Sequence, residues 1–286
     1  IIFPAPIGTV PTQINDARRT FEKVTWRLGA DYDFGKTLLY AVVSSGYKAG
    51  GFNDGCEIGA GPFCKLTASA LYYGPETVTA YEAGIKSRFA DNAVRLNASL
   101  FHYDYKGLQL TSTSNLCGGP CAITTNAGAA RIDGVEIEAT LQPNMYNRVD
   151  LGFNYLDARY HSFSPTAAID FAGRPLDRSP KVTASGGYTY TYPLGNSGRI
   201  EASARIRFSD SYVLTDYSAV VQFRQPSFHK TDLTLTYTAP GDRFFVQGFA
   251  RNVENEITLS GVSASSGGSA SFLDPFTYGV RTGFKF

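Results

Sequence analysis

The chain has 286 residues, enough for one large β domain or two smaller ones, and its net charge of +1 gives no electrostatic reason to expect a nucleic-acid partner. Charged residues make up 18% of the chain, below the roughly 25% of an average soluble domain, whereas aromatic residues reach 14%. No run of about 18 apolar residues occurs, which excludes transmembrane helices.

The first residues, "IIFPAPIGTVPTQ", contain three prolines and no alternating pattern. They lack a positively charged region followed by an apolar stretch and a cleavage site, so no signal peptide is predicted here. Either the mature chain begins at this point or the sequence is part of something longer. We expect residues 1–22 to be a loop remnant and residues 23–286 to form strands.

Alternation of apolar and polar residues then recurs along the whole chain and predicts about eleven β-strands. In "RIEASARIRF", for example, Ile200, Ile206 and other apolar residues alternate with Ser203, Arg207 and other polar ones. Side chains alternate between faces in a strand, so each segment has one apolar face. The predicted segments are 23–34, 36–47, 76–90, 92–106, 129–142, 146–158, 180–192, 198–210, 227–239, 242–253 and 274–286.

The connections between these segments alternate in length. "FGK", "ADN", "QPNMYN", "PLGNSG" and "APGD" are short and rich in turn residues, whereas the connections near 48–75, 107–128, 159–179, 211–226 and 254–273 are long. Short turns at one rim and long loops at the other are typical of outer-membrane barrels. The sequence therefore predicts an all-β fold: a transmembrane antiparallel up-and-down β-barrel.

Tyrosine and phenylalanine near strand ends suit the interfacial girdles of such a barrel, with ordinary packing in a β core as the alternative. Two clusters lie at Phe101, Tyr103 and Tyr105, and at Tyr188, Tyr190 and Tyr192. The terminal strand, with Tyr278, Phe284 and Phe286 on one face, ends the chain with the pattern of an outer-membrane protein.

An odd number of strands puts the two ends of the chain at opposite rims. Because bacterial barrels have even strand numbers and an open edge in lipid leaves backbone groups unsatisfied, we expect these strands to be the C-terminal half of a larger barrel. With the C-terminus at the periplasmic rim, residues 1–22 would be the remnant of an extracellular loop.

Four cysteines form two local pairs, Cys56 with Cys64 and Cys117 with Cys121, all in Gly-rich or Pro-rich stretches. Two loop disulfides fit an oxidising compartment. A zinc site is the competing interpretation, but neither nearby Cys-x-x-Cys repeats nor histidines support it. No catalytic constellation stands out, so no enzyme, cofactor or metal site is predicted. Glu136 and Glu138 on one strand face fit lumen charges better than a cation site.

Several motifs in order resemble the C-terminal half of a TonB-dependent outer-membrane receptor. They are "YAVVSSGYKAGGFN" (Tyr40–Asn53), "ETVTAYEAGIKSRF" (Glu76–Phe89), "NAGAARIDGVEIEA" (Asn126–Ala139), "SPKVTASGGYTY", "NVENEI" and the terminal "GVRTGFKF". The resemblance implies a barrel of about 22 strands in the outer membrane of a Gram-negative bacterium, with its C-terminus periplasmic and with lipid and lipopolysaccharide around it. The family's N-terminal plug domain and TonB-contacting segment are not among these residues.

In function, the resemblance implies active uptake of a scarce nutrient, with a ferric siderophore favoured and cobalamin or an oligosaccharide as alternatives. Energy would come from the TonB complex acting through the plug. A passive channel without a dedicated substrate is the competing class. Candidate ligand contacts lie in or beside the long loops, where aromatic rings could stack on a planar ligand: Tyr47, Lys48, Asn53, Tyr72 and Tyr73. The two loop tyrosines could equally cap the barrel or join the girdle.

Overall fold

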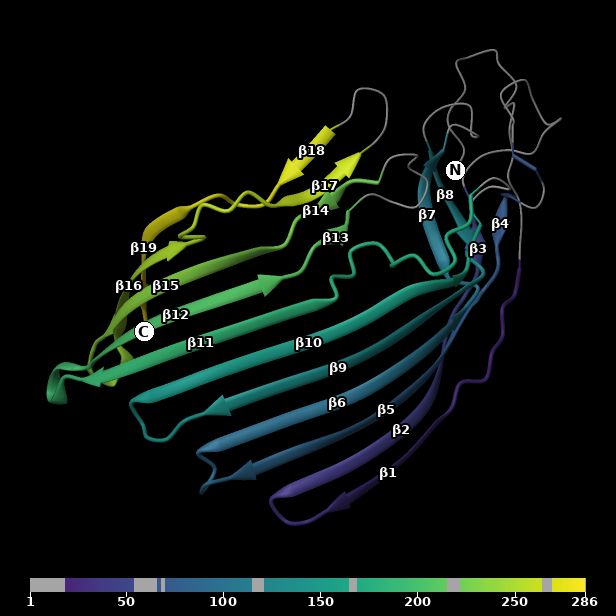
Figure 1. Ribbon diagram of the computed structural model, residues 1–286. Coiled ribbons are helices and arrows are strands. Elements are labelled where there is room, and N and C mark those ends of the chain that lie inside the picture. Colours follow the sequence, from purple (N-terminus) through teal and green to yellow (C-terminus); the bar gives the residue numbers. More distant parts are fainter. Residues whose placement is uncertain are drawn as a thin grey trace, which may run out of the picture.

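The computed structural model describes residues 19–53, 66–67, 70–114, 121–164, 169–214, 222–263 and 269–285. Its main feature is one curved antiparallel sheet of eleven strands (Figure 1). The strands are β1 (Arg27–Asp33), β2 (Thr37–Lys48), β5 (Glu76–Phe89), β6 (Val94–Lys106), β9 (Ala129–Leu141), β10 (Asn147–Ser162), β11 (Val182–Pro193), β12 (Arg199–Ser209), β15 (Phe228–Thr238), β16 (Phe244–Arg251) and β19 (Thr277–Phe284). The predicted all-β class is confirmed, and each predicted segment overlaps one of these strands.

Every strand of this sheet pairs with its neighbours in chain order, so the sheet is a simple up-and-down meander with β1 and β19 at its edges. Five connections are short, and they lie together at one rim, which we call the turn rim (Figure 1). Turn chemistry explains them: Gly35 has a φ of 84° and donates its N–H to Asp33 Oδ1 at 2.6 Å. The other ends of the strands form the loop rim.

In the part of the chain that the structure describes, four of the five long connections contain a two-stranded ribbon, where the sequence predicted loops. The ribbons are β3 (Gly51–Phe52) with β4 (Tyr72–Tyr73), β7 (Gln109–Ser114) with β8 (Cys121–Asn126), β13 (Tyr212–Val213) with β14 (Arg224–Gln225), and β17 (Leu259–Ser263) with β18 (Ser269–Phe272). The strands of the β3–β4 and β13–β14 ribbons have two residues each, too few for a period-two pattern, so only pairing with the opposite strand reveals them.

The register gives the sheet one apolar face and one polar face. A single cross-strand row on the apolar face contains only apolar and aromatic residues: Phe89, Val94, Leu141, Val149, Tyr188, Ala204, Leu233, Ala250 and Tyr278. The next row, on the polar face, runs through Arg88, Arg95, Thr140, Asp150, Gly187, Arg205 and Asp232. The apolar face is uncovered, as Tyr278 at 78% and Leu233 at 42% exposure show.

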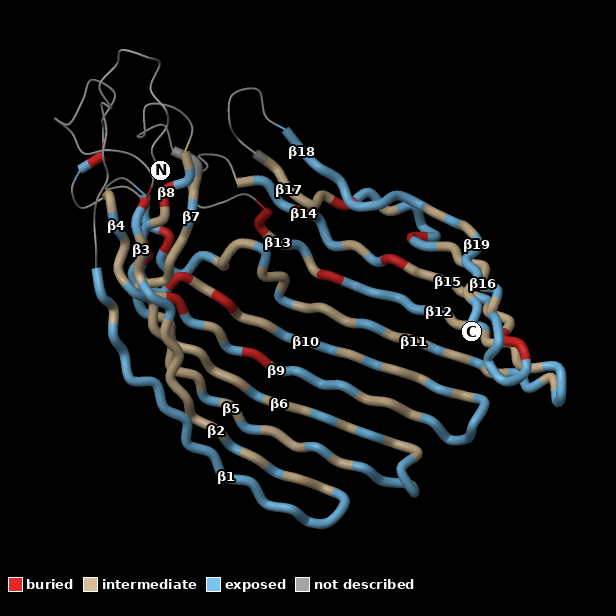
Figure 2. The backbone as a smooth tube through the Cα atoms, turned by 180° about the vertical axis from the view of Figure 1, so that it is seen from behind, coloured by how far each residue is buried: buried red, intermediate tan, exposed pale blue. Residues whose placement is uncertain are grey.

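Buried residues are few and lie mostly toward the loop rim (Figure 2). The one hydrophobic cluster among the described residues joins Ala127, Tyr160, Phe163 and Phe171, where two long connections meet. A sheet that leaves its large apolar side chains exposed has no core of its own on that face. Among the described residues, no helix has the length and apolar character needed to cross a membrane.

The two aromatic clusters lie on opposite faces. Tyr188, Tyr190 and Tyr192 lie on the apolar face near the turn rim, as a girdle requires. Phe101, Tyr103 and Tyr105 lie on the polar face instead, because Phe101 pairs with Glu82 and Gly134. Near its loop end, β6 carries rings or polar groups on both faces. The pattern of β6 alone therefore does not show which face is the apolar one, and only its register with the neighbouring strands does.

Candidate functional site

The predicted ligand-contact residues gather where β2 and β5 leave the sheet at the loop rim. Tyr47 and Lys48 end β2, and Tyr72 and Tyr73 form β4, which pairs with β3. Phe52 pairs with Tyr72, and both rings are more than 40% exposed. The Arg19 guanidinium stacks over the Tyr72 ring at 4.8 Å from its centre. We call Arg19, Phe52 and Tyr72 the aromatic patch.

The five predicted residues have different environments in this region. Tyr72 and Lys48 are exposed, whereas Tyr73 packs its ring against Gly51, so that a Cβ at Gly51 would displace the ring. The Tyr47 hydroxyl is buried and has no hydrogen-bond partner among the residues that the structure describes. The sequence reading missed Arg19 and Phe52; the pairing of β3 with β4 is what brings Phe52 beside Tyr72.

Asn53 is buried, and its carboxamide joins two loops. Its Nδ2 donates to the Ala70 carbonyl at 2.9 Å and to the Thr124 carbonyl at 2.8 Å, and its Oδ1 accepts the Thr124 N–H at 2.8 Å. Each of these three bonds goes to the backbone, so Asn53 ties the β3–β4 ribbon to the β7–β8 ribbon.

Asn126 and Gln109 reinforce the same junction. Asn126 donates to the carbonyls of Gly74 and Gly107 and accepts the Gly74 N–H at 2.6 Å. Gln109 donates to the carbonyls of Ala49 and Gly74. The sequence shows that amide side chains lie in these loops. It does not show which groups they bind, because their partners lie 17 to 71 residues away in the chain.

A second set of bonds joins the loops nearer the C-terminus. The Arg178 N–H donates to the Val213 carbonyl at 2.8 Å, and the Arg178 Nη1 donates to the Ser260 carbonyl at 3.1 Å. Buried Gln225 accepts the Leu259 N–H at 2.8 Å. Three long connections therefore meet through two side chains.

The cysteines fall largely outside the described residues. Cys121, the first residue of β8, forms a disulfide, and the other three, Cys56, Cys64 and Cys117, lie outside the described part of the chain. Both disulfide pairings stay predictions. Of the terminal aromatic residues, Tyr278 and Phe284 lie exposed on the apolar face of β19, and Phe286 lies outside the described residues.

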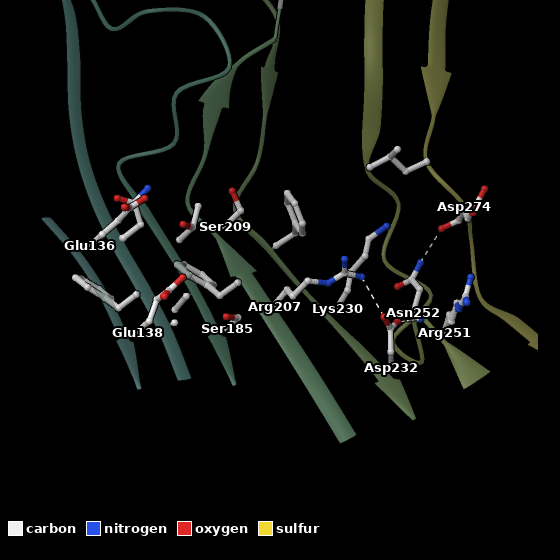
Figure 3. Close-up of a pocket in the computed structure, with 18 of the residues that line it drawn as sticks. Glu136, Glu138, Ser185, Arg207, Ser209, Lys230, Asp232, Arg251, Asn252 and Asp274 are labelled. Atoms are coloured by element: carbon white, nitrogen blue, oxygen red, sulfur yellow. Dashed lines mark hydrogen bonds and ion pairs between the residues drawn. The ribbon is translucent and has the colours of Figure 1, made fainter. Parts of the chain in front are cut away.

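The polar face carries a cavity of about 830 Å³ between β9 and β16, close to the loop rim (Figure 3). Glu136 and Glu138 line one side, and Arg207, Lys230 and Arg251 line the other. Within the described ranges, no group of three or more His, Cys, Asp or Glu side chains could hold a metal ion. The lining of the cavity is therefore largely polar and charged, with side chains of both signs.

Charged groups and a histidine also appear on the apolar face, at its loop end. His102 contacts Asp133 Oδ1 at 2.6 Å and Asp104 Oδ2 at 3.1 Å, and Arg131 contacts Asp104 at 3.5 Å. All of these residues lie on the same face of β6 and β9 as the apolar row, but nearer to the loop rim. The uninterrupted apolar surface therefore ends at this network.

Comparison with known proteins agrees with this architecture. The family model described as "TonB dependent receptor-like, beta-barrel" matches residues 6–259. The ferrichrome outer membrane transporter/phage receptor of Escherichia coli (strain K12) is 25% identical over 215 residues, which is 71% of this chain and 25% of that protein.

Solved structures show the same fold. The ferric yersiniabactin uptake receptor FyuA from Yersinia pestis has a TM-score of 0.71 at 21% identity, over 90% of this chain and 36% of that one. The siderophore receptor PiuA from Acinetobacter baumannii has a TM-score of 0.66 at 17% identity, over 90% of this chain and 35% of that one.

This chain thus spans a quarter of the curated relative and about a third of each of these two structures. The family model covers most of the chain, and the open sheet has the two-faced strands and the alternating turns and loops of a barrel wall. The chain belongs to the TonB-dependent receptor-like β-barrel family, whose members are outer-membrane transporters and not enzymes.

Proposed function

We propose that this chain forms half of the wall and several binding loops of an outer-membrane importer that takes up a ferric siderophore with energy from the TonB complex. The observation that carries the proposal is the family match combined with the names of the relatives, which handle ferrichrome, ferric yersiniabactin and a siderophore. TonB would act through a plug domain supplied by the part of the receptor upstream of these residues.

In this proposal, residues 23–286 supply about half of a barrel of about 22 strands, and residues 1–22 belong to an extracellular loop. The edges β1 and β19 pair with strands from outside this chain, because unpaired backbone groups cost several kcal/mol each in hydrocarbon. The turn rim and the C-terminus face the periplasm, and the loop rim faces outward.

The apolar face would contact lipid, and the network around His102 would lie at the level of lipid or lipopolysaccharide headgroups. Charged groups are costly in the hydrocarbon layer, which supports placing this network just outside it. The uncovered leucine, valine and tyrosine side chains support the same orientation.

For the ligand, we propose that the aromatic patch and Lys48 make direct contacts. Exposed rings beside a guanidinium can stack on a planar iron-binding group, and cations attract the negative charge that many iron chelators carry. Asn53 would act by positioning the ribbon that carries Phe52, and Tyr47 and Tyr73 would support it.

The test is growth of a deletion strain under iron limitation on a panel of ferric chelates, with the full-length gene restored. We expect at least one chelate to support growth only when both this receptor and TonB are present. Growth on cobalamin or an oligosaccharide instead would assign another cargo. Uptake that continues without TonB would identify a passive channel.

A further inference from the structure

A histidine on the apolar face lies between two carboxylates near the loop end of β6. The Nδ1 of His102 lies 2.6 Å from Asp133 Oδ1 on β9, and its Nε2 lies 3.1 Å from Asp104 Oδ2 on its own strand. Both ring nitrogens therefore contact carboxylate oxygens. The ring joins the two strands that flank the β7–β8 ribbon.

These two contacts depend on the protonation state of the ring. An ionised carboxylate only accepts hydrogen bonds, whereas a neutral imidazole has one N–H donor and one acceptor nitrogen. In a neutral His102, a nitrogen lone pair would face one of the two carboxylates. Two donated bonds require a proton on each nitrogen, so the geometry fits the imidazolium cation.

The charges of β6 and β9 around the ring alternate in sign. Arg131 Nε lies 3.5 Å from Asp104 Oδ1, so four side chains follow one another in a series: Arg131, Asp104, His102 and Asp133. With a charged ring, two cations balance two carboxylates, whereas a neutral ring leaves the series with a net negative charge. Lys106, at the end of β6, lies further along the same face.

The flanking strands contribute two titratable groups to the row of His102. On β5, Tyr81 lies directly opposite, with its ring centre 5.9 Å from that of His102. On β10, Asp157 lies opposite Asp133, but it is paired with Arg159 at 2.6 Å. The carboxylates that contact the ring are therefore those of β6 and β9.

From this geometry we infer that His102 forms a pH-sensitive latch between β6 and β9. The protonated ring donates to both carboxylates and closes the latch. When the ring loses a proton, one bond is lost and the exposed lone pair repels the carboxylate that it faces. The latch is therefore closed at low pH and opens as the pH rises through the titration of the ring.

The latch lies at the base of the β7–β8 ribbon, which Asn53 ties to the β3–β4 ribbon. The His102 side chain is 33% exposed, so the ring exchanges protons with its surroundings. The inference goes beyond the proposed function and does not require a ferric cargo. In the proposed orientation the loop rim faces outward, and the latch responds to the pH outside the cell.

The experiment observes the ring nitrogens of His102 by solid-state 15N NMR in the full-length receptor, labelled at histidine and held in lipid vesicles. Spectra are recorded at about pH 7.5, where an unperturbed imidazole with a pKa of about 6.5 is mostly neutral. The signal of His102 is identified by its loss in His102→Gln. The variants are Asp133→Asn and Asp104→Asn, and Asp157→Asn is the matched control on the same row.

We expect both nitrogens of His102 to carry a proton in the wild type. Asp133→Asn and Asp104→Asn should each reduce the protonated fraction of the ring, whereas Asp157→Asn should leave it unchanged. Asp104→Asn keeps the test available if Asp133→Asn fails to fold.

Hydrogen exchange measures the latch itself. Relative to the intrinsic rate of an unprotected amide at the same pH, exchange at the loop ends of β6 and β9 should become faster in the wild type as the pH rises. In His102→Gln this pH dependence should be absent, and in both proteins β11 and β12 should not change.

A neutral His102 ring at this pH in the wild type would overturn the inference, as would equal exchange profiles in the wild type and His102→Gln. None of these measurements involves transport. A receptor that imports no ferric chelate would refute the proposed function and leave the latch to be decided by these spectra.

Discussion

At the scale of single residues, the polar face depends on glycines that lie beneath aromatic rings on neighbouring strands. A Cβ built on Gly134 would collide with the Phe101 ring, and Gly279 and Gly283 stand in the same relation to Phe249 and Phe245. The ring covers the glycine backbone of the next strand, so the two residues form one packing unit.

We expect Gly134→Ala to destabilise the folded receptor by about 1–3 kcal/mol, because the added methyl group displaces the Phe101 ring. Denaturant unfolding of the full-length receptor in lipid vesicles measures the change. Gly248→Ala is the matched control, since no described atom beyond its two chain neighbours lies within 4 Å of its added Cβ. Equal losses at the two glycines would argue against ring packing as the cause.

Glu254 lies at the start of a long loop, and its ionisation should make the local stability of that loop depend on pH. A hydrogen bond from Thr231, whose N–H lies 2.7 Å from Glu254 Oε2, holds the pKa of the Glu254 carboxyl below its usual range. A carboxyl with a lowered folded-state pKa stabilises the structure above the unfolded pKa, about 4.3, and loses that contribution as pH falls through the folded pKa.

Protonation of Glu254 should therefore weaken the protection of the Thr231 amide. Its hydrogen exchange, relative to the intrinsic rate of an unprotected amide at the same pH, should become faster as the pH falls. In Glu254→Gln this additional acceleration should be absent. An identical pH profile in the two proteins would show that the carboxylate does not hold the loop.

At the scale of elements, the short ribbons at the loop rim depend on side chains that reach across chain connections. Asn53 couples β3–β4 to β7–β8, and Arg178 couples two further loops. Loops braced in this way present their exposed rings in a fixed arrangement, which lowers the entropy lost when a ligand binds.

Asn53→Ala should cost about 1–3 kcal/mol of local stability, because it leaves partly buried backbone groups at Thr124 and Ala70 unpaired. Hydrogen exchange should quicken at Thr124 and in β4, and stay unchanged in β11 and β12. Asn97→Ala is the control, since within the described ranges its side chain makes one long hydrogen bond, to exposed Glu138 at 3.5 Å. Unchanged exchange at Thr124 in Asn53→Ala would rule out the brace.

At the scale of the whole molecule, the two faces of the sheet require different surroundings. An uncovered row of apolar side chains runs across strands from β5 to β19, one residue away from a row of charges. Lipid on one side and a polar interior on the other satisfy both rows, as in a transmembrane barrel.

Neighbouring residues of β15 test this orientation. Leu233→Arg, midway along the strand on the apolar face, should cost about 2–4 kcal/mol, whereas Thr234→Arg on the polar face should cost much less. Unfolding of the full-length receptor in vesicles gives both values. Similar penalties for the two variants would contradict the lipid-facing assignment of Leu233.

The sequence by itself determined the strands, their two faces and the alternation of turns and loops, because a strand's period and a turn's chemistry are local properties. Only the tertiary structure decided which distant groups meet: Asn53 with Thr124, Phe52 with Tyr72, and Lys230 with Arg207. Those contacts depend on strand register and on loops that fold back over the rim. Register is a relation between segments, and no single segment's pattern contains it.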